Sequence, residues 1–189
     1  MQIDIFWIFF LLFMSIYPII YPRVIISYTL WRIKSITSFI SSQIDFIKRE
    51  IKRKNVKNDE KKLDEILEYF VIQPTSLDPF GIVKKFDFIL KKSEDKLRSF
   101  VRSMFKVEEE ELRNLQTSIE ILIEMNNLKK ILDHYSNLIK KMKNIQYAIL
   151  IQMYLPIYER IAKAYSSGAI TIMRNSPIGD GIGPLVISK

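Results

Sequence analysis

Residues 5–22 read IFWIFFLLFMSIYPIIYP, an apolar run without a charged residue between Asp4 and Arg23. An α-helix rises about 1.5 Å per residue, so this run would span roughly 27 Å, close to the ~30 Å hydrocarbon core of a bilayer. We therefore predict that residues 1–22 form a single transmembrane anchor, with the lipid bilayer as the partner of this segment.

Aromatic side chains lie near both ends of the predicted anchor, as is typical of residues at membrane interfaces. The lipid contacts that we expect come from Trp7, Phe10, Phe13, Tyr17 and Tyr21. Pro18 and Pro22 remove backbone donors near the C-terminal end, so we expect them to kink or end the helix there.

A cleaved secretory signal peptide and a buried soluble helix are the alternatives to a retained anchor. A signal peptide carries positive residues before its apolar run and small residues at its cleavage site. Here Asp4 precedes the run, and no small-x-small site follows it. Buried soluble helices are seldom uncharged on every face over such a length. The residues therefore favour the retained anchor.

Positive charge is concentrated just after the apolar run. Residues 23–62 hold eleven Lys or Arg and four Asp or Glu, a net charge of +7, against +8 for the whole chain. The positive-inside rule places this flank in the cytoplasm. We therefore expect a single-pass protein of the cell membrane with its N-terminus outside and its C-terminal body in the cytoplasm.

Residues 26–51 carry the clearest periodicity, with apolar positions alternately four and three apart and one polar break at Thr37. This seam consists of Ile26, Leu30, Ile33, Ile40, Ile44, Ile47 and Ile51. One interpretation is a coiled coil between copies, in which Ile33, Ile40, Ile44 and Ile47 form a homo-oligomer. The other is a juxtamembrane amphipathic helix within residues 23–57 that packs on its own chain. The sequence leaves both open.

Residues 48–62 form a basic cluster for which two interpretations compete. Contact with anionic lipid headgroups or nucleic acid is one, and a solvated helix face is the other. A straight helix would carry Lys48 roughly 37 Å beyond Arg23, far more than the ~8 Å Debye length at physiological salt. No aromatic platform or DNA-binding motif accompanies the cluster, so we do not expect nucleic acid as a partner.

Helical patterns continue through a predicted body at residues 58–167. A short helix ends before Pro74, and Asp78 followed by Pro79 is a typical helix start. The acidic residues at 108–111 open a long helix, where they complement the helix dipole. These elements predict a helical hairpin or bundle.

A last helix is expected over residues 144–167, ending at Gly168 as a C-cap. Residues 169–173 resemble a short strand, although one strand cannot build a sheet. The fold class that we predict is all-α, consisting of the transmembrane helix, the amphipathic juxtamembrane helix and the helical body.

Residues 168–189 form a glycine-rich tail in which Gly179, Asp180, Gly181 and Gly183 are candidates for binding a phosphate. A phosphate loop follows a strand and opens a helix, whereas Pro184 is a poor opening here. The hexapeptide at 179–184 is similar to a stretch in isocitrate and isopropylmalate dehydrogenases, where Glu follows instead of Leu185. A fragment of an enzyme with a phosphate-binding turn is thus one alternative function.

The composition restricts the chemistry further. The chain has no cysteine and one histidine, His134, which excludes disulfides, thiolate metal sites and histidine-rich zinc sites. No catalytic constellation stands out, so we expect no catalytic residue, metal or cofactor and do not favour an enzyme.

Four segments together resemble an archaeal family of uncharacterised membrane-anchored proteins. They are the apolar N-terminus, residues 73–85 with LDPFGIV, residues 155–160 with LPIYER and residues 177–184 with PIGDGIGP. The resemblance implies a domain of unknown function, of which this chain would be the N-terminal part, and it brings no activity or site residues. The function that we expect is a membrane-anchored helical interaction or scaffold module whose protein partner is unknown.

Overall fold

The computed structural model describes the backbone of residues 5–54, 60–70, 95–105 and 108–174. Within these ranges it describes all side chains except those of residues 5–11, 13, 15–19, 54, 60, 110–111 and 173–174. The helices are α1 (Ile5–Lys54), α2 (Glu60–Phe70), α4 (Glu109–Met142) and α5 (Ile145–Arg174), and residues 95–104 are also helical. No strand occurs in the described ranges, which confirms the predicted all-α class for them.

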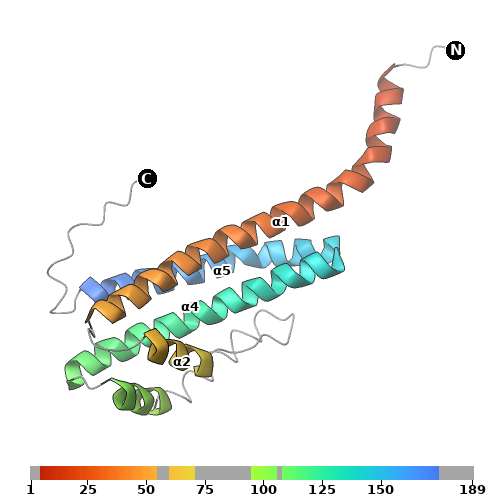
Figure 1. The fold of residues 1–189 in the computed structure, drawn as a ribbon. Helices are drawn as coiled ribbons and strands as arrows, with labels where there is room; N and C mark the ends of the chain where they lie inside the picture. Colours follow the sequence, from red (N-terminus) through yellow and green to blue (C-terminus); the bar gives the residue numbers. More distant parts are fainter. Residues whose placement is uncertain (1–4, 55–59, 71–94, 106–107, 175–189) are drawn as a thin grey trace.

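Three long helices, α1, α4 and α5, pack side by side into a bundle, and α1 extends beyond it as an arm (Figure 1). The arm bends where it leaves the bundle. Helix α1 nevertheless runs without interruption through Pro18 and Pro22, so of the two predicted effects of these prolines, ending the helix is wrong. A proline inside a helix removes one backbone hydrogen bond and commonly bends the helix instead of ending it.

The isoleucine seam of α1 lies in the core of this single chain. Ile33, Ile40, Ile44 and Ile47 are 1%, 0%, 5% and 1% exposed. The core side chains that α4 and α5 contribute include Ile119, Leu122, Leu132, Ile151 and Leu155. The packing is therefore that of the second interpretation, an amphipathic helix covered by its own chain.

The acidic residues at the start of α4 have a structural partner in the helical segment 95–104. Glu109 accepts hydrogen bonds from Arg98 and Arg102, and both arginines lower the pKa of its carboxyl group, Arg102 more strongly. Glu108 is the N-cap residue of α4 but makes no side-chain capping bond. The predicted start at Asp78 and Pro79 lies outside the described residues.

Helix α5 is longer than the sequence predicted. It continues through Gly168 to Arg174, so both the expected C-cap at Gly168 and the expected strand at 169–173 are wrong. The reason is tertiary packing, because Ala169 is 1% exposed and belongs to the core. Burial of the next turn outweighs the tendency of glycine to end a helix.

We expect Gly168→Ala to raise the free energy of unfolding by about 0.5–1 kcal/mol, because glycine is the less favourable residue inside a helix. The added Cβ would lie 3.8 Å from Cδ1 of Ile121, an ordinary van der Waals contact. Urea unfolding followed by circular dichroism measures the change. A loss of stability would mean that helix α5 ends at Gly168 after all.

Among the side chains that the structure describes, no helix offers a stretch long and apolar enough to cross a membrane. The predicted anchor residues Trp7, Phe10, Phe13 and Tyr17 belong to α1, but their side chains lie outside the described set. Tyr21 is described and is 41% exposed.

Candidate functional site

Two contacts between α1 and α5 fix which parts of the bundle lie together. Arg32 pairs with Glu159 at 3.0 Å, and the hydroxyl of Ser166 donates a 2.9 Å hydrogen bond to Gln43. The contact that lies later in α1, at Gln43, also lies later in α5, at Ser166, so the two helices run parallel. The start of α5, and the α4–α5 turn before it, therefore lie at the end of the bundle from which the arm of α1 emerges (Figure 1). We call this region the turn end and define it as residues 23–32 of α1 with residues 140–157.

The α4–α5 turn is tight and well satisfied. Lys143 adopts a left-handed conformation with φ 49°, and its N–H donates to the carbonyl of Ile139 at 2.9 Å. The side-chain oxygen of Asn144 accepts hydrogen bonds from the N–H groups of Gln146 and Tyr147 at 2.8 and 3.3 Å, which caps α5. The turn thus projects three exposed lysines, Lys140, Lys141 and Lys143, in fixed positions.

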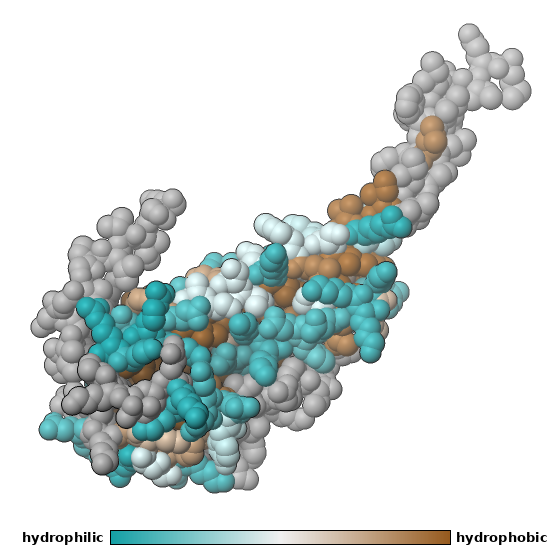
Figure 2. All heavy atoms as spheres, in the orientation of Figure 1, coloured by the Kyte–Doolittle hydropathy of each residue, from teal (hydrophilic) through white to brown (hydrophobic). Residues whose placement is uncertain are grey.

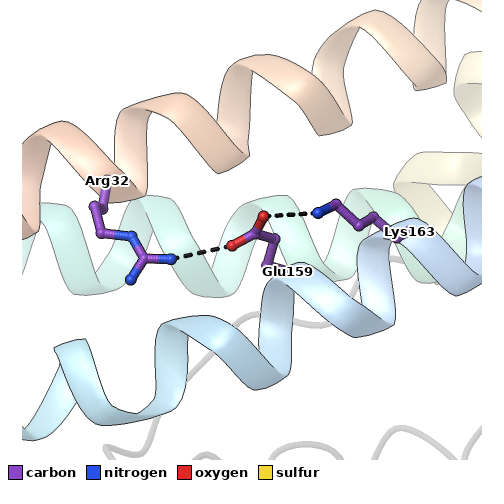
Figure 3. A network of polar contacts seen from close by, with 3 residues as sticks. All are labelled: Arg32, Glu159 and Lys163. Carbon is purple, nitrogen blue, oxygen red and sulfur yellow. Dashed lines mark hydrogen bonds and ion pairs between the residues drawn. The ribbon is translucent and has the colours of Figure 1, made fainter. Parts of the chain in front are cut away.

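A polar network joins α1 to α5 at the edge of the turn end (Figure 3). One carboxylate oxygen of Glu159 accepts a 2.9 Å hydrogen bond from Lys163 of the same helix, and the other accepts one from Arg32 of α1. These cations, led by the hydrogen bond from Lys163, lower the pKa of Glu159. Because all three side chains are partly exposed, solvent screens the network, and we assign it to orienting the two helices and not to chemistry.

Three tyrosines are buried between α4 and α5. The hydroxyls of Tyr135 and Tyr158 lie 3.2 Å apart, within hydrogen-bonding distance. The Tyr147 hydroxyl is also buried, and no hydrogen-bond partner for it exists among the described residues. Burial raises the pKa of Tyr147 above its ordinary value, and the neighbouring Tyr135 raises it further. Tyr147 therefore stays neutral at physiological pH, and all three side chains pack the core.

Large apolar side chains are exposed mainly at the turn end and on the arm. On α1, Val24, Tyr28 and Trp31 are 56%, 46% and 63% exposed, and the Tyr28 and Trp31 rings stack at 5.8 Å. At the end of α4 and in the first half of α5, the exposed apolar residues are Met142, Ile149, Leu150, Met153 and Ile157. Figure 2 shows hydrophobic residues on the surface of α1 where the helix leaves the bundle. We call the exposed apolar residues of the turn end the collar.

The other predicted sites fall elsewhere. The described part of the basic cluster, residues 48–54, lies at the opposite end of α1 from the arm, and several of its cations have partners there. Lys48 pairs with Asp64, Arg53 lies 4.0 Å from Glu50, and Arg49 donates to the carbonyl of Asp45.

The candidate phosphate-binding residues Gly179, Asp180, Gly181 and Gly183 lie outside the described residues. In the described part of the chain, no three His, Asp or Glu side chains are grouped so as to hold a metal ion.

The turn-end lysines and the exposed face of α5 are absent from the sequence-based predictions. A signal for them exists in the sequence, because residues 5–44 and 134–158 contain no Asp or Glu. Only the parallel pairing of α1 with α5 brings these two acid-free stretches to one end.

The family model for the N-terminal domain of a protein of unknown function (DUF1512) matches residues 4–175. No curated protein and no solved structure matches the chain. The expected resemblance to a family of unknown function is confirmed, and the chain belongs to the DUF1512 N-terminal domain family.

Proposed function

We propose that this DUF1512 family member is a membrane-anchored helical module that holds a three-helix bundle at the cytoplasmic face of a cell membrane. The observation that carries the proposal is the continuity of α1, which contains both the apolar run 5–22 and the buried isoleucine seam. Insertion of the first part would fix the position of the second, because no loop separates them. The bundle would then present an interaction partner or a further domain to the membrane surface.

The described side chains of the arm support this proposal. Leu12, Met14 and Ile20 are 50%, 56% and 50% exposed in the single chain. Apolar side chains that stay exposed in this way are typical of a surface that contacts lipid or a partner. In a membrane-inserted arm, acyl chains would cover them.

Self-association through Ile33, Ile40, Ile44 and Ile47 is not carried into the proposal. These four side chains already fill the core of one chain, so an intermolecular seam would first have to open the bundle. For the basic cluster at residues 48–62, the pairing of Lys48, Arg49 and Arg53 within the chain favours a solvated face over a lipid or nucleic-acid site.

The topology can be tested in cells with single cysteines, because the chain has no natural cysteine. We expect a membrane-impermeant maleimide to label Gln2→Cys in intact cells and Ser188→Cys only after permeabilisation, because the positive flank stays inside. The protein should also remain in the membrane pellet after alkaline carbonate extraction. Extraction into the supernatant would overturn the anchor, and labelling of Ser188→Cys in intact cells would overturn its orientation.

A further inference from the structure

We propose that the turn end is itself a lipid-binding surface, seated in the headgroup layer of the cytoplasmic leaflet, with anionic phospholipid as its ligand. This inference rests on the proposed anchor, because the arm of α1 would deliver the turn end to the membrane. It adds a second contact, made by the folded bundle, and it names the lipid class.

The position of the turn follows from the pairing of α1 with α5. Ile145 precedes Glu159 by about 21 Å of helix, and the same length of α1 counted back from Arg32 reaches roughly residue 18. The turn therefore lies about level with the end of the apolar run 5–22. A bilayer that contains the run would have its headgroups at the height of the turn.

The collar covers more than one face of the bundle. On α1, Val24, Tyr28 and Trp31 project away from the side that buries Ile33 and Ile40. On α5, Met153 and Ile157 project away from the side that buries Ile151, Leu155 and Tyr158. A globular partner would cover one such face, whereas a membrane interface surrounds the whole end of a bundle. Among the described residues from Arg23 onward, the only exposed large apolar side chain outside the turn end is Tyr69 of α2.

The charges of the turn end complement anionic headgroups. The acid-free stretches 5–44 and 134–158 meet there, so the cations Arg23, Lys140, Lys141 and Lys143 face no carboxylate of their own segments. Basic residues just below a span attract anionic lipid within about one Debye length, roughly 8 Å. Tyr28 and Trp31 supply the aromatic rings that favour the interface.

Tryptophan fluorescence in the full chain tests the depth, because the chain has only two tryptophans, Trp7 and Trp31. In Trp7→Phe, reconstituted in vesicles, we expect Trp31 to be quenched by lipids brominated near the headgroup and protected from aqueous iodide. In Trp31→Phe, we expect Trp7 to be quenched by acyl-chain bromines. If acyl-chain bromines quench Trp7 while iodide quenches Trp31, this inference alone is overturned. If iodide quenches Trp7, the proposed anchor is overturned.

A second probe samples α5 with a matched control. An environment-sensitive fluorophore attached to Met153→Cys should emit at a shorter wavelength in vesicles than the free dye does in aqueous buffer, because Met153 belongs to the collar. The same fluorophore on Tyr69→Cys should keep its aqueous emission, since Tyr69 is similarly exposed, at 66% against 70%, but lies outside the turn end. Aqueous emission at both positions would overturn the collar as a membrane contact.

The lipid class is tested with a fluorophore on Met142→Cys, which lies among the three lysines. We expect spin-labelled phosphatidylglycerol to quench it more than spin-labelled phosphatidylcholine at equal content, with local enrichment on the order of fivefold for each lysine at the surface. Replacing Lys140, Lys141 and Lys143 by Gln should remove most of the difference, because only Arg23 then remains of the four turn-end cations, and replacing Lys52, Arg53 and Lys61 by Gln should leave it unchanged. Equal quenching by both lipids in the unsubstituted background would overturn the anionic specificity.

Discussion

Replacing Ile40 by Ala in the full chain is expected to lower the free energy of unfolding by about 2–5 kcal/mol, the usual cost of a large-to-small change at a fully buried site. Ile40 is 0% exposed and lies in the middle of the seam that α4 and α5 cover. The removed methyl and methylene groups leave a cavity that the surrounding helices fill only in part. Urea unfolding in detergent micelles, followed by circular dichroism, measures the loss.

Met153→Ala is the matched control, because Met153 is an apolar helical residue that is 70% exposed. Its change in stability should stay within about 0.5 kcal/mol, as is usual for surface positions. The same unfolding curves, repeated at several protein concentrations, separate packing within one chain from packing between chains. Unfolding midpoints that rise with protein concentration would contradict intrachain burial of Ile40, because stability of an oligomer depends on concentration.

The isoleucine seam shows how far the sequence determines this fold. A spacing of alternating threes and fours depends only on the helix period, so the buried side of α1 could be predicted from residues 26–51 alone. The same spacing does not specify what covers that side. Whether Ile40 meets α4 and α5 or a second copy depends on long-range packing that the period of one helix does not contain.

The prediction that α5 ends at Gly168 was wrong, and the turn end was not predicted, for the same physical reason: both depend on tertiary packing. The local tendency of glycine to end a helix is correct on average, but burial of Ala169 in the core keeps α5 helical. The cations at 140–143 and the aromatic residues at 28–31 are each visible in the sequence. Their proximity follows only from the parallel direction of α1 and α5, which the contacts of Arg32 with Glu159 and Gln43 with Ser166 establish.

Tyr147→Phe is expected to raise the free energy of unfolding at neutral pH by about 1–3 kcal/mol, the cost of a buried polar group without a partner. The ring would keep its place in the core, and the buried hydroxyl, which has no hydrogen-bond partner among the described residues, would disappear. Tyr69→Phe, at a position 66% exposed, should leave stability unchanged. A loss of stability in Tyr147→Phe would show that this hydroxyl is hydrogen-bonded in solution.

Alkaline pH gives the same residue a second, independent readout. The folded state raises the pKa of Tyr147, so the unfolded chain releases this proton first, near pH 10. The contribution of the neutral group to stability is therefore complete below about pH 10 and is lost as the pH rises towards the higher folded-state pKa. Above pH 10, stability should fall less steeply in Tyr147→Phe than in the unsubstituted chain, by up to about 1.4 kcal/mol per pH unit for one proton. Parallel slopes would mean that Tyr147 ionises equally easily in both states, and hence that its hydroxyl reaches water in the folded bundle.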